Sequence, residues 1–157
     1  MSDEETTDHL FLTCPFALEV WKGVLMLNSD NFELPRNISN LFQSWSNLSP
    51  FGPSKNLLLK NCWLWIPKIV CWKLWLERNN RLFRNERCNS PRVITKVKAL
   101  LGETLEANSA NKPGKALNSE EDLWLNGLVP NHKDCSTLSA SVHSNWEIRL
   151  EEQEFIK

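Results

Sequence analysis

The sequence lacks the short motifs that mark the common catalytic and nucleotide-binding sites. It contains no glycine-rich phosphate loop, no H-E-x-x-H pattern and no G-x-S-x-G pattern. Its acidic residues gather in hydrophilic runs such as "DEETTD" and "EEQE", which are typical of solvated surface charge. We therefore predict that the chain is not an enzyme, has no catalytic residues and takes no small-molecule substrate.

A long apolar run without charges is also absent. Residues 57–76 have the length of a membrane span, but Lys60, Lys68 and Lys73 are spread through them. Each lysine would cost about 2.5–3.5 kcal/mol near the centre of a bilayer. We therefore expect this segment to form a core helix, and we expect no membrane partner.

No secretory signal precedes the cysteines, whose number, five, is odd. Reduced thiols fit this pattern better than a disulfide framework does. We therefore predict a nuclear or cytoplasmic protein that is not secreted.

Tyrosine is missing, whereas tryptophan occurs eight times. Large indole surfaces are typical either of a well-buried core or of an interaction face.

Apolar residues at helical spacing predict a mainly α fold. We expect helices near residues 15–27, 38–47, 55–86 and 91–107, and a short helix from Ser119. Pro15 and Pro91 suit first helical positions, and Ser90 can cap the fourth helix. The third helix is apolar on much of its circumference, so it should be central to the fold, and Pro67 should kink or split it.

These elements predict a small irregular helical domain over residues 1–107, followed by a flexible linker and a truncated C-terminal tail over residues 108–157. Residues 129–145 are polar and are expected to be disordered. The expected core consists of apolar residues that share helical faces, namely Phe11, Phe16, Val20, Trp21, Val24, Phe42, Trp45, Leu58, Trp65, Ile66, Ile69, Trp72, Leu76, Val97 and Leu101.

Charge is strongly segregated along the chain. The net charge is -5 over residues 1–54, +9 over residues 55–100 and -5 over residues 101–157. A basic middle between acidic flanks is a candidate surface for nucleic acid or for an acidic partner. The simpler interpretation is a long helix with a solvated basic face.

The stretch "WKLWLERNNRLFRNER", residues 72–87, has arginine at every third position from residue 78 and aromatic residues between. Arginine with aromatic residues can bind backbone phosphates and stack on bases. We therefore predict that RNA or DNA is bound by five basic residues: Lys73, Arg78, Arg81, Arg84 and Arg87. The alternative is that the aromatic residues belong to the core while the arginines pair with carboxylates such as Glu77 and Glu86. The residues alone leave both interpretations open.

His9 and Cys14 have the spacing of the closing half of a zinc knuckle, in which two cysteines come first. A structural zinc site takes four nitrogen or sulfur ligands. The alternative is a half-exposed histidine beside a buried cysteine.

The other cysteines do not complete this set. Cys62 and Cys71 fall on opposite faces of the expected third helix and are interpreted as packing residues. His132, Cys135 and His143 resemble a ligand set only loosely.

Two stretches together resemble the reverse transcriptase zinc-binding domain of plant non-LTR (LINE-type) retrotransposons. They are "DHLFLTCPFALEVW", residues 8–21, which follows an acidic loop, and "PKIVCWKLWLERNNRLF", residues 67–83, with scattered tryptophans between them. The resemblance covers residues 3–90 strongly and residues 91–128 loosely.

The resemblance implies a zinc site in which His9 and Cys14 complete a C-x-x-C pair located just before the acidic loop. This sequence starts after such a pair, so we expect zinc to bind weakly or not at all. The resemblance further implies a transposon-derived accessory module of a reverse transcriptase polyprotein, whose polymerase domain lies upstream. Two functions remain open, a nucleic-acid-binding module and a helical remnant that acts only in protein–protein packing.

Overall fold

The computed structural model describes residues 6–26, 33–49, 57–109 and 119–128. Within these ranges the protein is mainly α and has no β-strand, which confirms the predicted fold class. The segment expected to be disordered, residues 129–145, and the rest of the C-terminal tail lie outside the described residues.

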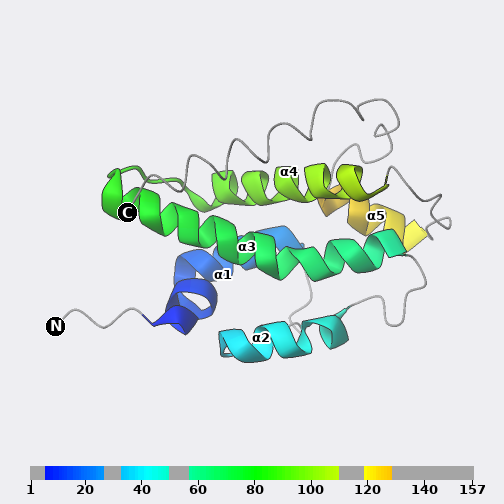
Figure 1. Ribbon diagram of the computed structural model, residues 1–157, viewed down its shortest axis with the longest axis horizontal. Helices are drawn as coiled ribbons and strands as arrows, with labels where there is room; N and C mark the ends of the chain where they lie inside the picture. The colour runs from blue at the N-terminus through cyan, green and yellow to red at the C-terminus, as the bar shows by residue number, and fades with distance from the viewer. Residues whose placement is uncertain (1–5, 27–32, 50–56, 110–118, 129–157) are drawn as a thin grey trace.

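The helices follow the expected order along the chain. They are the π-helical turn η1 (His9–Thr13), α1 (Pro15–Leu25), α2 (Ile38–Ser44), the 3-10 turn η2 (Trp45–Leu48), α3 (Leu57–Phe83), α4 (Ser90–Ser109) and α5 (Ser119–Leu128). In Figure 1 α3 and α4 lie side by side along the molecule, α1 packs against both, and α2 lies on the far side of α3 from α4. The long helix is thus central, as its apolar circumference predicts.

The segment before α1 ties the N-terminus of α2 to the rest of the fold. The Asp8 carboxylate accepts a hydrogen bond from the backbone N–H of Ile38 at 2.8 Å. Asn37, the N-cap residue, accepts one from the N–H of Asn40 at 2.8 Å. Two N–H groups of the first turn of α2 are therefore satisfied, one by a local cap and one by a residue thirty positions earlier.

The cap of α4 differs from the expected one. The side chain of Asn89, not of Ser90, accepts the hydrogen bond from the N–H of Arg92, at 3.1 Å. Ser90 is itself the first residue of the helix and is buried. The expectation was wrong by one residue because asparagine and serine are both good N-caps and occur side by side here.

Most of the expected core is found where the sequence placed it. Val20, Trp21, Val24, Trp45, Ile66, Ile69, Val97 and Leu101 are buried, while Phe11, Phe16, Leu58 and Trp65 are partly buried and pack against them. Phe42 and Trp72 are exposed, so their assignment to the core was wrong. In α2 the neighbouring Leu41 supplies the core contact instead of Phe42, and in α3 the buried Leu74 lies on the side opposite Trp72.

The core continues past residue 107 into α5. Leu125 and Leu128 are fully buried in the same cluster as the residues of α1, α3 and α4. The ammonium of Lys98, on α4, donates a hydrogen bond to the carbonyl of Gly127 at 3.1 Å, near the C-terminus of α5. A cation at this end of a helix is favoured by the helix dipole.

Gly23 permits the close approach of α1 to α4. A Cβ atom at this position would overlap the side chain of Ile94, which belongs to α4. Glycine lowers the stability of α1 through its conformational entropy, but at this position it allows the two helices to come into close contact.

Pro67 lies inside α3, which continues through it as one helix rather than splitting. In Figure 1 the ribbon of α3 bends near the middle of its length. Proline has no N–H, so the carbonyl four residues earlier, that of Trp63, receives no helical hydrogen bond from it. The indole N–H of Trp45 donates to that carbonyl at 2.7 Å, and the indole N–H of Trp63 donates back to the carbonyl of Trp45 at 2.9 Å. Because of the proline, the Trp63 carbonyl is free to accept the hydrogen bond from Trp45 that joins η2 to α3.

Candidate nucleic-acid interface

The outward face of α3 carries two exposed tryptophans. The buried residues of this helix, among them Ile66, Val70 and Leu74, lie on the side facing the core. At 100° per residue, Trp72 and Trp75 fall on the opposite side. They are 43% and 40% exposed, and their rings stack on each other with centroids 5.1 Å apart and planes 22° apart.

The same outward face continues to the end of the helix. Phe83, its last residue, is 81% exposed, and Leu82 beside it is exposed as well. Lys68, one turn before Trp72, is also exposed. A contiguous exposed apolar surface with cations at its edge is typical of an interaction site.

The structure separates the five predicted basic residues into different environments. Arg84 and Arg87 are exposed just beyond the C-terminus of α3. Lys73 and Arg78 are half-buried, and they line two different hollows. The every-third-residue spacing therefore winds these side chains around α3 instead of gathering them on one face.

Arg81 has three partners within the fold. Its Nε donates to the carboxylate of Glu77 at 2.8 Å, and its Nη2 donates to the carbonyl of Cys88 at 3.4 Å. Its guanidinium also lies over the ring of Phe16, 4.2 Å from the centroid, which is a cation–π geometry. Arg81 thereby links α3 to α1 and to the connection before α4, the alternative role that the sequence left open for these arginines.

Glu77 is the centre of this link. The residue is 4% exposed, and its carboxylate accepts hydrogen bonds from Arg81 and from the N–H of Cys88, each at 2.8 Å. Burial alone would raise the pKa of Glu77, but the Cys88 hydrogen bond and the adjacent guanidinium together outweigh burial and lower the pKa below its ordinary value. The carboxylate is therefore held ionised and turned towards its partners.

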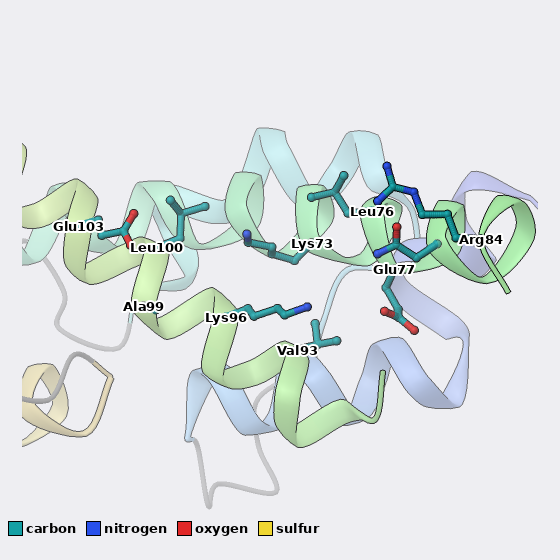
Figure 2. A pocket seen from close by; sticks show the side chains of 10 residues that line it. Lys73, Leu76, Glu77, Arg84, Val93, Lys96, Ala99, Leu100 and Glu103 are labelled. Carbon is teal, nitrogen blue, oxygen red and sulfur yellow. The ribbon is translucent and has the colours of Figure 1, made fainter. Parts of the chain in front are cut away.

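A groove with a volume of about 440 Å³ runs between α3 and α4. Lys73, Glu77 and Asn80 of α3, Arg84 just beyond its end, and Lys96 and Glu103 of α4 form its polar lining. Leu76, Val93, Ala99 and Leu100 form its apolar part. Figure 2 shows the side chains of Lys73 and Lys96 lying in the space between the two ribbons.

Lys96 is a basic residue that sequence reasoning missed. It lies on α4, one residue before the buried Val97, and nothing in its local pattern separates it from other surface lysines. Only the packing of α4 along α3 brings it opposite Lys73.

A smaller hollow of about 200 Å³ lies where η1 and α1 meet α3. Cys14, Arg78 and Arg81 all line it, so Cys14 lies close to two of the predicted basic residues. His9 is exposed on η1, and its carbonyl accepts a hydrogen bond from the N–H of Cys14 at 2.9 Å.

Among the described residues, no group of three or more histidine, cysteine, aspartate and glutamate side chains could hold a metal ion. The expectation that His9 and Cys14 bind zinc weakly or not at all stays a prediction. His132, Cys135 and His143 lie outside the described residues.

Cys62 and Cys71 have the packing role that was predicted for them. Cys62 is buried and Cys71 is half-buried against the core. Burial raises the pKa of both thiols to about 12, so both remain protonated at neutral pH.

Comparison with known proteins found no matching family model, no similar curated protein and no similar solved structure. Within the described ranges, none of the helices combines the length and the apolar character needed to cross a membrane.

Proposed function

We propose that the protein binds single-stranded nucleic acid through the outward face of α3. The observation that carries this proposal is the exposure of the stacked Trp72 and Trp75 rings. Bases stack on exposed aromatic rings whatever their sequence, and each stacked base contributes about 1–3 kcal/mol. A double helix hides its bases from such a platform, so single strands are the preferred ligand.

Charge supports the same assignment. The described part of the basic segment includes all of α3 and the beginning of α4, and residues 55–100 carry a net charge of +9. Arg84 and Arg87 are exposed beyond Phe83 and are available to phosphates. Arg78 and Lys73 flank the aromatic face, whereas Arg81 holds the fold together and contributes through its charge.

The resemblance in sequence extends this proposal to a biological setting. We propose an accessory module of a retrotransposon reverse transcriptase polyprotein, non-catalytic in itself, that helps the polymerase hold template RNA or target DNA. His9 and Cys14 are the residues that would ligate zinc in such a module.

A second candidate function rests on Leu82 and Phe83. Their exposure at the end of α3 also suits a protein partner that covers an apolar surface. In that case the same face packs against a neighbouring domain, and nucleic acid is not bound.

Anisotropy of a fluorescein-labelled 12-nucleotide single-stranded RNA separates the two functions. We expect the wild-type protein to bind it more tightly than the matching duplex, and Trp72→Ala and Trp75→Ala each to weaken binding about five- to a hundredfold. The matched control is Phe42→Ala, which removes an exposed aromatic side chain from α2 and should leave affinity unchanged.

Salt provides the second readout. Replacing both Arg84 and Arg87 with alanine should flatten the salt dependence of log Kd by about one to one and a half units, because each lost phosphate contact in a single strand accounts for about 0.7. The stacking platform would be rejected if single-stranded and duplex RNA bound equally well and if neither tryptophan substitution changed the affinity. Absence of any binding would favour the packing function.

A further inference from the structure

We infer that the groove between α3 and α4 is the part of the interface that takes the phosphodiester backbone, with the bases laid on Trp72 and Trp75 beside it. This inference rests on the proposed function and makes it specific. It assigns α4 a direct role in binding and adds Lys96 to the interface.

The first argument is the convergence of cations from two helices. Lys73 and Lys96 extend into the groove from opposite sides, and Arg84 lies at its end near the C-terminus of α3 (Figure 2). A groove that faces solvent with cations on both walls focuses positive potential between them. A linear polyanion can run along such a groove and meet each cation in turn.

The second argument concerns the acids that could cancel this charge. Glu77 lines the groove, but its carboxylate is engaged by Arg81 and by the N–H of Cys88. Glu103 is exposed at the other end, two turns of α4 beyond Lys96. The three cations of the lining, Lys73, Arg84 and Lys96, thus outnumber its two carboxylates, and the lining carries a net positive charge.

The third argument is the environment of the Lys96 ammonium. Within the described residues, its hydrogen-bond partner is the sulfur of Cys88, 3.6 Å away. Thiol sulfur is a weak acceptor. A charged ammonium with only a weak partner gains most from an oxygen anion such as a phosphate.

The fourth argument is the position of the groove relative to the aromatic pair. Leu76 lines the groove and lies one helical turn after Trp72. Lys73 follows Trp72 directly in the chain. The rim of the groove and the indole of Trp72 are therefore neighbours on α3, so a backbone in the groove places its bases over the rings.

The test uses two probes, a 12-nucleotide oligouridine and an abasic deoxyribose-phosphate oligomer of the same length. The abasic probe offers phosphates without bases, so it reports on the groove alone. The protein variants are Lys73→Gln with Lys96→Gln, Glu103→Gln, Trp72→Ala, and the control Lys60→Gln. Lys60 is exposed on α3, thirteen residues before Lys73 and hence about 20 Å along the helix.

We expect the double lysine variant to flatten the salt dependence by about one to one and a half units for both probes, while Lys60→Gln changes neither. Glu103→Gln should raise affinity for both probes about two- to fivefold, because it removes a like charge from the groove. A gain of affinity cannot come from misfolding. Thermal unfolding by circular dichroism, compared across all variants, controls for loss of structure in the lysine double variant.

The outcomes separate this inference from the proposed function. If oligouridine binds and depends on Trp72, yet ignores the lysine and Glu103 substitutions, the groove assignment is overturned and the stacking platform stands. If the abasic probe responds to these substitutions while Trp72→Ala leaves oligouridine binding intact, the groove stands and the platform fails. Failure of the wild-type protein to bind either probe overturns both.

Discussion

Two tryptophan pairs stack within the described part of the chain, and their surroundings are opposite. Trp45 and Trp63 lie 4.6 Å apart at 12°, each is 2% exposed, and each indole N–H is bonded to the other residue's carbonyl. Trp72 and Trp75 stack at 5.1 Å, and they are 43% and 40% exposed. The first pair joins η2 to α3, whereas the second lies on the side of α3 opposite its buried residues.

The difference follows from helix geometry. Trp63 and Trp72 are nine positions apart in α3, which is two and a half turns and places them on opposite faces. The inner face carries the Trp63 carbonyl, which Pro67 leaves without a helical donor and which Trp45 of η2 binds. The outer face is exposed to water. The same residue type therefore stabilises the fold at one position and is available for a ligand at the other.

The largest effect that distinguishes the pairs should come from the buried ring. Trp63→Ala removes a fully packed aromatic side chain and leaves the Trp45 carbonyl without its indole donor. We expect it to lower the free energy of unfolding by about 3–5 kcal/mol. Urea denaturation followed by circular dichroism measures this. Trp75→Ala is the matched control and should cost less than about 1 kcal/mol. Equal losses of unfolding free energy for Trp63→Ala and Trp75→Ala would contradict the division into a buried, stabilising pair and an exposed pair.

The next effect concerns the ionic link below the exposed pair. Glu77→Gln should cost about 1–3 kcal/mol at neutral pH, because it weakens hydrogen bonds to a charged acceptor. The folded pKa of Glu77 lies below its ordinary value of 4.5, so its stabilisation is present above that pH and is lost as pH falls through the folded pKa.

Unfolding free energies of wild type and Glu77→Gln at pH 7 and pH 3 test this sign. The gap between the two proteins should be smaller at pH 3 than at pH 7. A gap that widens on acidification would contradict the assignment of an ionised Glu77. Glu103→Gln, an exposed change of the same kind on α4, is measured alongside as the matched control.

A smaller effect tests the role of Pro67. Trp45→Phe keeps a ring in place but leaves the Trp63 carbonyl without its donor. In the Pro67→Ala background that carbonyl gains a helical N–H, so Trp45→Phe should cost less there than in the wild type. We expect a coupling of about 1 kcal/mol in a double-mutant cycle. Strict additivity would show that the proline and the indole act independently.

The smallest effect is expected at the zinc half-site. A complete structural site contributes about 10–16 kcal/mol of apparent binding free energy, and two ligands provide only part of it. We expect no tight one-to-one zinc binding in competition with a chromogenic chelator, and a stability change within about 0.5 kcal/mol for His9→Ala. Tight zinc that disappears in both His9→Ala and Cys14→Ala would contradict this account.

Much of the fold could be predicted from the sequence because helical spacing is a local signal. The bounds of α1 and α4, the central position of α3 and the burial of Trp21 and Ile66 all followed from it. The faces of α3 were harder, since apolar residues surround the helix and its pattern does not say which side has a partner. Trp72 was assigned to the core for that reason.

The candidate site depended on contacts between distant segments. No local pattern shows that Trp45 reaches the carbonyl opened by Pro67, or that Arg81 is held by Glu77 and Phe16. Lys96 became part of the groove only because α4 packs along α3. These features come from tertiary packing, which a single sequence does not encode in its spacing.

One measurement compares the two tryptophan pairs directly. The protein is labelled with 5-fluorotryptophan, each resonance is assigned by a single Trp→Phe substitution, and ¹⁹F spectra are recorded during titration with the 12-nucleotide oligouridine. The account predicts that the resonances of Trp72 and Trp75 move to saturation while those of Trp45 and Trp63 stay in place. Resonances of Trp72 and Trp75 that remain fixed, at an oligouridine concentration that saturates anisotropy, would contradict the claim that the outward face of α3 binds single strands.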